Sequence, residues 1–342
     1  MTQKRILTDV AIMRPMVMFM LVVLHSFTTY AGYWPYPDGI QPVRAYSWIA
    51  LASYSFLLEA FFFMSGYVAA FQESNRTISF TELVRKKFKR LMMPCLVFGT
   101  AYALMYRPQT SIGHWIKEIV GGSGHLWFLP TLFIVMIASY FVHRLKIKEW
   151  IKVALLLVLS FASFRFTKVT FQVQFACYYM FFYYTGTFIY KHRDTILEWA
   201  TGGKVWLVAL LYVVVFVVGT LHIESIRPDG PATAYMLSRS KLGIINAWRV
   251  AYGSLGTMAM WLMINRMWSS ITIPKWLSWA NSISFGVYIF QNFILWGLFQ
   301  YTALPAITGT YLMPWAGLLI ATIGSVALTA ALKQTRIGKQ LL

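Results

Sequence analysis

Apolar residues in this chain come in long runs, not in the short alternating pattern that predicts half-buried strands. A helix needs about 20 consecutive, mostly apolar residues to cross a bilayer. The runs predict an all-α, polytopic integral membrane bundle of ten transmembrane helices, at residues 11–31, 48–72, 91–106, 125–142, 151–165, 174–190, 205–222, 246–265, 282–302 and 311–332.

The composition agrees with a membrane protein. Of the 342 residues, 58% are hydrophobic and only 12% are charged, whereas a soluble domain carries about 25% charged residues. No linker rich in proline, glycine or serine and no internal repeat divides the chain. We therefore expect a single domain over residues 1–342, with no fused extracytoplasmic domain.

The distribution of charge predicts the topology. The net charge is +19. When residues at the edges of the spans are included, the segments on one side of the bundle hold 20 of the 30 lysines and arginines, and those on the other side hold 8. Because basic loops stay in the cytoplasm, both termini are expected there. Arg249 lies close enough to the outer end of its span to snorkel. The excess charge also favours contact with anionic membrane lipids. No loop is long enough to form a basic water-facing domain, which argues against a nucleic-acid partner.

The first apolar run contains two ionisable residues, Arg14 and His25. Eleven residues at ~100° and ~1.5 Å each place His25 within ~20° of Arg14 around the helix and ~16 Å further along it. Ionisable groups cost ~2.5–3.5 kcal/mol in hydrocarbon, so this face is expected to meet protein or a wet cavity. Neutral imidazole can take a proton from an alcohol or be acylated itself, which makes His25 the candidate base. The alternative is a histidine that hydrogen-bonds between helices for packing.

The second run contains a carboxylate and a small polar pair. Glu59 lies in the middle of the run, where an unpaired carboxylate is costly, so we expect it to pair with Arg14 or His25 and to be functional. Ser65 and Gly66 give a small, polar surface that a ligand or another helix can approach closely. The alternative is helix packing by small residues together with a structural ion pair.

Two further groups flank the third and fourth spans. Arg85, Lys87 and Arg90 belong to a basic run before the third span, and such cations suit a polyphosphate such as the nucleotide of coenzyme A. The alternative is charge that only sets the topology. His125 and Trp127, at the outer edge of the fourth span, can bind a sugar face, although Trp127 is equally typical of an aromatic belt. No Cys/His spacing is typical of a metal centre.

Together these motifs resemble acyltransferase family 3, a family of integral membrane acyltransferases. Its members have a basic residue about ten positions before a histidine in the first helix, and an acidic residue with a Ser-Gly pair in the second. A basic stretch leading into Arg-Leu and a proline follows, and then a Trp-Phe-Leu element. The matching residues here, in the same order and over essentially the whole chain, are Arg14, His25, Glu59 to Gly66, Lys87, Arg90, Leu91, Pro94 and Trp127 to Leu129.

The resemblance implies an enzyme of the bacterial cytoplasmic (inner) membrane. It would take an acyl group, often acetyl, from cytoplasmic acyl-CoA and pass it to a hydroxyl, commonly on a cell-envelope or exported glycan. His25 would be the catalytic histidine, Arg14 its partner, and Lys87 and Arg90 the pair on the CoA side. Acyl-CoA would be the donor substrate, and no permanently bound cofactor is expected. The acyl chain, the acceptor and the oligomeric state stay open.

The chain departs from the family pattern at two places. Family members often have two arginines three positions apart where this chain has Lys87 and Arg90. Many carry a histidine in the ninth span where this chain has Gln291, which can hydrogen-bond a substrate but cannot serve as a base.

The alternative function is a transporter or flippase for an envelope glycan, with the buried charges lining a pathway. The absence of inverted repeats counts mildly against it. A small-molecule permease or receptor would leave the basic run without a ligand.

Overall fold

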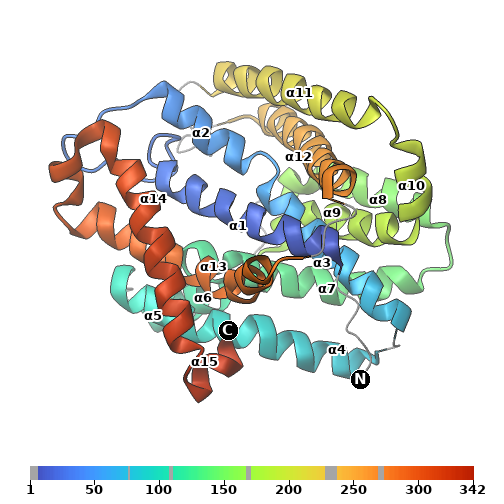
Figure 1. Ribbon diagram of the computed structural model, residues 1–342, viewed down its shortest axis with the longest axis horizontal. Coiled ribbons are helices and arrows are strands. Elements are labelled where there is room, and N and C mark those ends of the chain that lie inside the picture. The colour runs from blue at the N-terminus through green and yellow to red at the C-terminus, as the bar shows by residue number, and fades with distance from the viewer. Residues whose placement is uncertain (1–6, 76–77, 108–110, 167–170, 228–236, 269–272) are drawn as a thin grey trace. The chain divides into compact units, whose positions relative to one another are not determined.

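The structure is a computed structural model that describes residues 7–75, 78–107, 111–166, 171–227, 237–268 and 273–342 (Figure 1). Over these ranges it consists of helices and turns, without strands, so the all-α class is confirmed. The α-helices are α1 (Thr8–Phe27), α2 (Arg44–Tyr54), α3 (Leu57–Asn75), α4 (Phe80–Lys87), α5 (Met93–Tyr106), α6 (Ile112–Gly121), α7 (Phe128–Arg144), α8 (Glu149–Ala162), α9 (Val173–Lys191), α10 (Arg193–Trp199), α11 (Lys204–Ile226), α12 (Arg239–Trp268), α13 (Lys275–Tyr301), α14 (Leu304–Leu332) and α15 (Arg336–Leu341). A π-helix, η1 (Phe88–Met92), and two 3₁₀ turns, η2 (Gly124–Trp127) and η3 (Ser163–Phe166), complete the order.

Each of the ten predicted spans overlaps with one or more helices. Within the described part of the chain, six segments are long and apolar enough to cross a membrane: α1, α2 with α3, η2 with α7, α11, α13 and α14. The other four predicted spans fall on α5, α8, α9 and α12, which are shorter or less apolar. The membrane character of the chain is therefore supported, while ten crossings and cytoplasmic termini stay predictions.

One predicted span, 48–72, is not a single helix, because a break at Ser55 separates α2 from α3. The Ser55 hydroxyl donates to the carbonyl oxygen of Ala52 at 2.8 Å and lies 2.7 Å from the Tyr212 hydroxyl. A serine that bonds to the preceding turn competes with the backbone ladder of the helix. An apolar pattern does not reveal such a break, because the residues on both sides remain hydrophobic.

Helix α14 is also interrupted, at Gly309. Its φ of +63° lies in the left-handed region, which glycine occupies without a steric penalty. The predicted span 311–332 begins just after this bend, so the apolar pattern marked only the longer arm of the helix.

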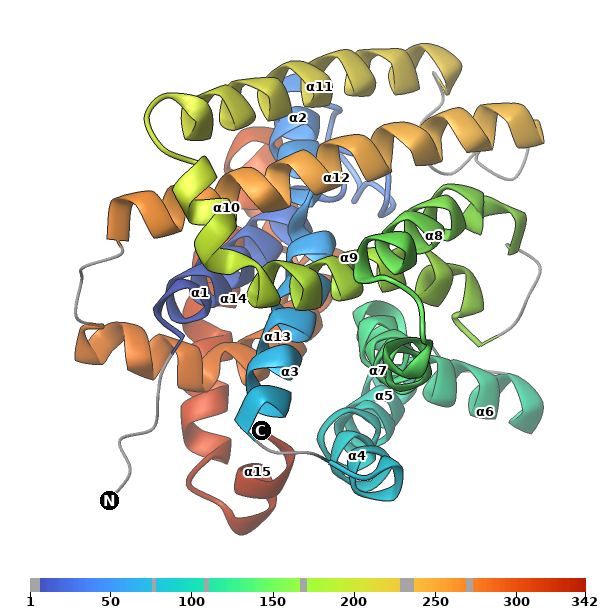
Figure 2. The same cartoon turned by 90° about the vertical axis from the view of Figure 1, so that its right-hand side faces the viewer.

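The chain divides into two compact units, and the first comprises Met1–Phe61 and Asp194–Thr335. Within it α1 lies against α2, α12, α13 and α14, and α11 runs alongside α12 (Figure 2). The Trp261 indole N–H donates to the buried carboxylate of Asp9 at 3.1 Å, which ties α12 to the start of α1. Helix α1 is therefore held on several sides.

The second unit comprises Phe62–Arg193 and Arg336–Leu342, so helix α3 begins in one unit and continues into the other. Within the second unit α9 lies against α7 and α8, and α5 lies against α6. Its interior is rich in aromatic rings, such as Phe62, which stacks on Tyr179 with 4.3 Å between ring centroids. Stacked aromatic pairs of this kind add to the stabilisation from burial alone.

Two glycines let α3 and α9 approach each other at backbone distance. A Cβ atom at Gly66 would lie 1.8 Å from the carbonyl oxygen of Tyr183, and one at Gly186 would lie 2.0 Å from that of Phe63. The Thr187 hydroxyl donates to the Gly66 carbonyl oxygen at 3.3 Å. Small residues permit this kind of close helix crossing in membranes.

Candidate functional site

His25 lies in the last turn of α1 and is held by Gln291 of α13. Its Nδ1 atom is 3.0 Å from the side-chain oxygen of Gln291, which is fully buried. The side-chain nitrogen of Gln291 donates to the Tyr288 carbonyl oxygen at 3.4 Å. These two bonds fix the amide so that its oxygen faces the imidazole.

This orientation selects one tautomer of His25. An amide oxygen only accepts hydrogen bonds, so Nδ1 of His25 must carry the proton. The lone pair of the neutral ring is then on Nε2. A histidine oriented in this way through one nitrogen can act as a base through the other, which is the arrangement of catalytic histidines in general.

Trp34 orders the imidazole from a different direction. Its ring is nearly parallel to that of His25, with an interplanar angle of 8° and 5.9 Å between centroids. Trp34 in turn makes edge contacts with Trp296 at 5.0 Å and Phe299 at 6.5 Å. The imidazole is therefore positioned by an amide and by an aromatic ring, both within the first unit.

Arg14 and Glu59, the other predicted residues of this region, also lie in the first unit. Arg14 is half-buried on α1, and Glu59 is 2% exposed near the start of α3. A Cβ atom at Gly253 of α12 would lie 2.8 Å from the Cγ atom of Glu59, so only glycine leaves room for this side chain. The pairing of Glu59 with Arg14 or His25 stays a prediction.

Arg249 precedes Gly253 by one helical turn and therefore lies on the same face of α12 as the glycine that meets Glu59. Its guanidinium carbon is 5.7 Å from the centroid of the Tyr54 ring, within the range of a cation–π contact. The sequence indicated only a snorkelling arginine at this position. The structure instead places Arg249 in the wall of a cavity.

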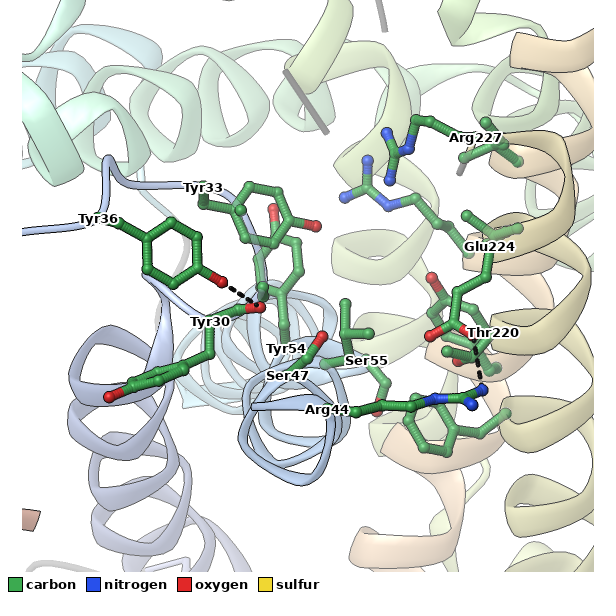
Figure 3. A pocket seen from close by; sticks show the side chains of 18 residues that line it. Tyr30, Tyr33, Tyr36, Arg44, Ser47, Tyr54, Ser55, Thr220, Glu224 and Arg227 are labelled. Carbon is green, nitrogen blue, oxygen red and sulfur yellow. Dashed lines mark hydrogen bonds and ion pairs between the residues drawn. The ribbon is translucent and has the colours of Figure 1, made fainter. Parts of the chain in front are cut away.

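This cavity has a volume of about 560 Å³ and belongs entirely to the first unit (Figure 3). Its walls come from the segment after α1, from α2 and from the facing parts of α11 and α12. The polar side chains that line it are those of Tyr30, Tyr33, Tyr36, Arg44, Ser47, Tyr54, Ser55, Thr220, Glu224, Arg227, Arg249 and Tyr252.

Two tyrosines of the loop after α1 and the end of α11 lie on different sides of the cavity. Figure 3 shows Tyr33 and Tyr36 on the side of the loop that follows α1, opposite the end of α11, which carries Glu224 and Arg227. Arg44 of α2 reaches across to Glu224, with 3.4 Å between the guanidinium nitrogen and the carboxylate oxygen. Leu51, Phe216 and Ile245 also line the cavity, so its walls combine polar and apolar side chains.

Sequence reasoning missed most of this region. None of the residues predicted as site residues lines the cavity, and Trp34 was not singled out. Tyrosines in outer loops are typical of an interfacial belt, which concealed their role as a wall. The one available indication was the charge of Arg249 inside an apolar run.

In the second unit, the basic run spans the end of α4 and the π-helix η1. Arg85 and Arg90 are exposed, and Lys87 is half-buried. Burial, together with the charges of Arg90 and Lys86, lowers the pKa of Lys87 to about 8. Lys86 has a different role, since it forms an ion pair with Glu82 at 2.8 Å.

The second half of this basic run lies in the π-helix η1 and not in a regular α-helix. Pro94 lies at the start of α5 and has no N–H to donate to the carbonyl of Arg90, so the regular ladder is interrupted there. The Met93 N–H instead bonds to the Phe88 carbonyl oxygen, five residues back. Such wide turns occur often at functional sites.

Three predicted substrate contacts also lie in the second unit. Ser65 precedes the glycine of the close α3–α9 crossing. His125 is buried in η2, with its ring 5.8 Å from that of Tyr102. Trp127 contacts the Phe175 ring of α9 at 4.6 Å. Their predicted contact with substrate stays a prediction.

The predicted site residues thus fall into two groups, one in each unit. The structure brings His25 and Gln291 together in the first unit, and Lys87 and Arg90 together in the second. Among the described residues, no group of three or more His, Cys, Asp or Glu side chains is placed to hold a metal ion.

A model of acyltransferase family 3, described as an acyltransferase domain, matches residues 8–333, nearly the whole chain. No curated protein and no solved structure shows a significant match to this chain.

Proposed function

Because this chain belongs to acyltransferase family 3, we propose that it transfers an acyl group, most simply acetyl, from cytoplasmic acyl-CoA to a hydroxyl of a cell-envelope or exported glycan. The family makes the chain a membrane acyltransferase. The finer assignment of donor, acceptor and membrane is our proposal, and the bacterial inner membrane fits it because acyl-CoA is cytoplasmic and the acceptor is exported.

The observation that carries this proposal is the hydrogen bond between His25 and Gln291. With Nδ1 protonated, Nε2 accepts the proton of the acceptor hydroxyl while the hydroxyl oxygen attacks the thioester carbonyl carbon. The C–S bond then breaks, the ester forms, and the CoA thiolate takes the proton back from Nε2. In a second route, Nε2 itself attacks the thioester carbonyl and expels the CoA thiolate. The acyl-imidazolium then acylates the hydroxyl, which regenerates neutral His25, and the hydroxyl proton passes to the thiolate.

Gln291 is assigned here to the positioning of His25 and not to substrate contact. Both polar atoms of its side chain already have partners, His25 and the Tyr288 carbonyl. Arg14 and Glu59 remain proposed members of the same region, as groups that position and do not transfer protons.

The basic run is the proposed site for the CoA nucleotide. Lys87, Arg90 and Arg85 offer three cations over two turns of helix, which suits a ligand that carries several phosphates. The π-helix supports this role because it presents Arg90 at a turn that an uninterrupted helix would not form. Ser65, His125 and Trp127 remain proposed substrate contacts.

The test compares membranes that contain the wild type or His25→Ala, supplied with labelled acetyl-CoA and total envelope glycan. We expect transfer to fall by about 10²- to 10⁴-fold, the contribution of a positioned general base. Release of CoA thiol and label in the glycan are both measured. The matched control is His192→Ala, which removes an exposed histidine of the second unit and is expected to leave transfer unchanged.

Full transfer by His25→Ala at equal expression would show that the proposed mechanism is wrong. Absence of CoA release by the wild type with every acceptor fraction would instead favour the transporter or flippase.

A further inference from the structure

The cavity of the first unit contains chemistry that the acyl-transfer reaction described above does not use. Its described lining includes five tyrosines, three arginines and one glutamate. A volume of about 560 Å³ lies within the range of pockets that hold small ligands. On the predicted topology, all the segments that form it lie at the outer side of the membrane.

The aromatic wall suits a sugar ring. Tyr33 and Tyr36 are exposed at the cavity edge, where a ligand can reach their side chains. The Tyr30 and Tyr36 hydroxyls donate to the backbone carbonyls of Thr310 and Tyr30, respectively, which orders the segment that carries these rings. Tyrosine offers an apolar face and a polar edge, the combination that a pyranose ring requires.

The opposite wall suits an anion. Arg44 is matched by Glu224, with which it forms an exposed ion pair. Arg227 and Arg249 add two more guanidinium groups. Even when Glu59, behind the wall near Arg249, is counted against them, the described residues retain a surplus of positive charge. A guanidinium binds a carboxylate or phosphate through two parallel hydrogen bonds.

The cavity is adjacent in the chain to the proposed base. Tyr33, in its wall, directly precedes Trp34, whose ring stacks on His25. Tyr30 lies five residues after His25 and also lines the wall. A ligand in the cavity therefore contacts the same short segment that orders the imidazole.

We propose that this cavity is the acceptor site and that it selects an acidic saccharide, with the sugar ring on the tyrosines and its carboxylate or phosphate on Arg227 and Arg249. The inference rests on the proposed function only where it identifies the bound saccharide as the acceptor. The binding itself is expected without acyl-CoA. The shared chemistry is an anionic group on a sugar, and the choice of probes separates the two anions.

The experiment measures binding to the purified full chain in lipid nanodiscs, without acyl-CoA. The probes are methyl glucuronide, glucose 6-phosphate and methyl glucoside, followed by saturation-transfer NMR with titration. We expect at least one acidic sugar to bind about tenfold more tightly than the neutral one, and the tighter of the two identifies the anion. Inorganic phosphate, which has no ring, is expected to compete weakly.

Variants locate the site. Arg227→Gln and Arg249→Gln should each reduce the affinity for the acidic sugar towards that for methyl glucoside, about five- to tenfold. Tyr36→Ala should weaken all three sugars alike, because it removes a ring and not a charge. Arg239→Gln is the matched control, since Arg239 is exposed on α12 and does not line the cavity.

Equal affinity for the acidic and neutral sugars, or unchanged binding in both Arg227→Gln and Arg249→Gln, would overturn the inference. His25→Ala should bind the acidic sugar like the wild type, which separates this result from that of the transfer assay. If acidic sugars do not bind while His25→Ala abolishes transfer, only the acceptor inference fails. If they bind but CoA is never released, only the proposed function fails.

Discussion

The surroundings of His25 in the first unit and the basic run in the second unit differ in how firmly their side chains are held. His25 is fixed by a buried amide at 3.0 Å and by a parallel indole ring. In the basic run, by contrast, Arg85 and Arg90 extend into exposed positions. One region has a defined geometry and the other has a concentration of charge.

This difference predicts different kinetic roles. A fixed geometry lowers the barrier of a chemical step, because the reacting groups need no further ordering. Exposed cations capture an anionic ligand, and each exposed contact contributes modestly and is weakened by salt. Substitutions around His25 should therefore lower kcat, whereas substitutions in the basic run should raise the KM for acyl-CoA.

The largest of these effects is expected from Gln291→Leu. Leucine fills similar space but cannot accept a hydrogen bond from the Nδ1–H of His25, so the imidazole loses its preferred tautomer. We expect kcat to fall by about 10- to 100-fold, the usual cost of losing an outer partner of a functional histidine. The KM for acyl-CoA should not change, and steady-state kinetics in nanodiscs measure both quantities.

Gln334→Leu is the control for this substitution, because Gln334 is an exposed glutamine of the same unit that does not line the cavity. A rise in KM with unchanged kcat in Gln291→Leu would mean that Gln291 contacts substrate.

The next effect is expected from the double variant Lys87→Ala/Arg90→Ala. Removing two cations should weaken the binding of CoA by about tenfold, since ionic contacts at a protein surface contribute up to about 1 kcal/mol each. Binding is measured by calorimetry with CoA itself, at low and at physiological salt. Lys89→Ala removes an exposed cation of the same run and is the matched control. Unchanged affinity of the double variant for CoA would mean that the basic run only determines the membrane topology.

A smaller effect is expected from pH. Because the pKa of Lys87 is lowered to about 8, its ammonium group is mostly charged at pH 7 and mostly neutral at pH 9. The KM for acyl-CoA should therefore rise by about three- to fivefold over this interval, because the ionic contact of Lys87 is lost. Lys87→Arg keeps its charge throughout and should remove the dependence. An identical pH profile for both proteins would exclude Lys87 from the donor site.

The smallest effect on catalysis is expected at the crossing of α3 and α9. A Cβ atom at Gly66 would lie 1.8 Å from a backbone oxygen, so Gly66→Ala should destabilise the fold by about 1–3 kcal/mol. The midpoint of thermal unfolding in nanodiscs measures this change. Gly113→Ala is the control, because nothing lies within 4 Å of a Cβ atom there and alanine favours the helix. A thermal midpoint in Gly66→Ala equal to that of the control would contradict close packing as the role of the glycine.

The sequence predicts the helices of this fold well because each is defined by a local apolar pattern. Helix α11 matches its predicted span closely, and the predicted span 125–142 falls on η2 and α7. The break at Ser55 was missed because the residues on both sides of it are hydrophobic, and the hydroxyl that meets Ser55 belongs to Tyr212, far away in the sequence. Local patterns contain no information about such a partner.

The candidate site was only partly predictable for the same reason. His25 was identified from its cost inside an apolar run, which needs no partner to be recognised. The hydrogen bond from His25 to Gln291 joins residues 266 positions apart, so the sequence context of Gln291 predicted only a substrate contact and could not reveal its proposed role in positioning His25. The cavity draws residues from segments that are distant in the sequence, and tyrosines in outer loops have an ordinary explanation of their own.

The amide of Gln291 also determines where a proton can travel. A glutamine side chain can hold the imidazole but, unlike a carboxylate, adds no negative charge to stabilise an imidazolium and does not take up its proton. A proton that arrives at Nε2 of His25 must therefore leave from the same atom. Such a catalyst uses a single ring nitrogen and transfers one proton, or one deuteron, at a time. Acyl transfer in mixtures of light and heavy water should accordingly slow in direct proportion to the deuterium fraction.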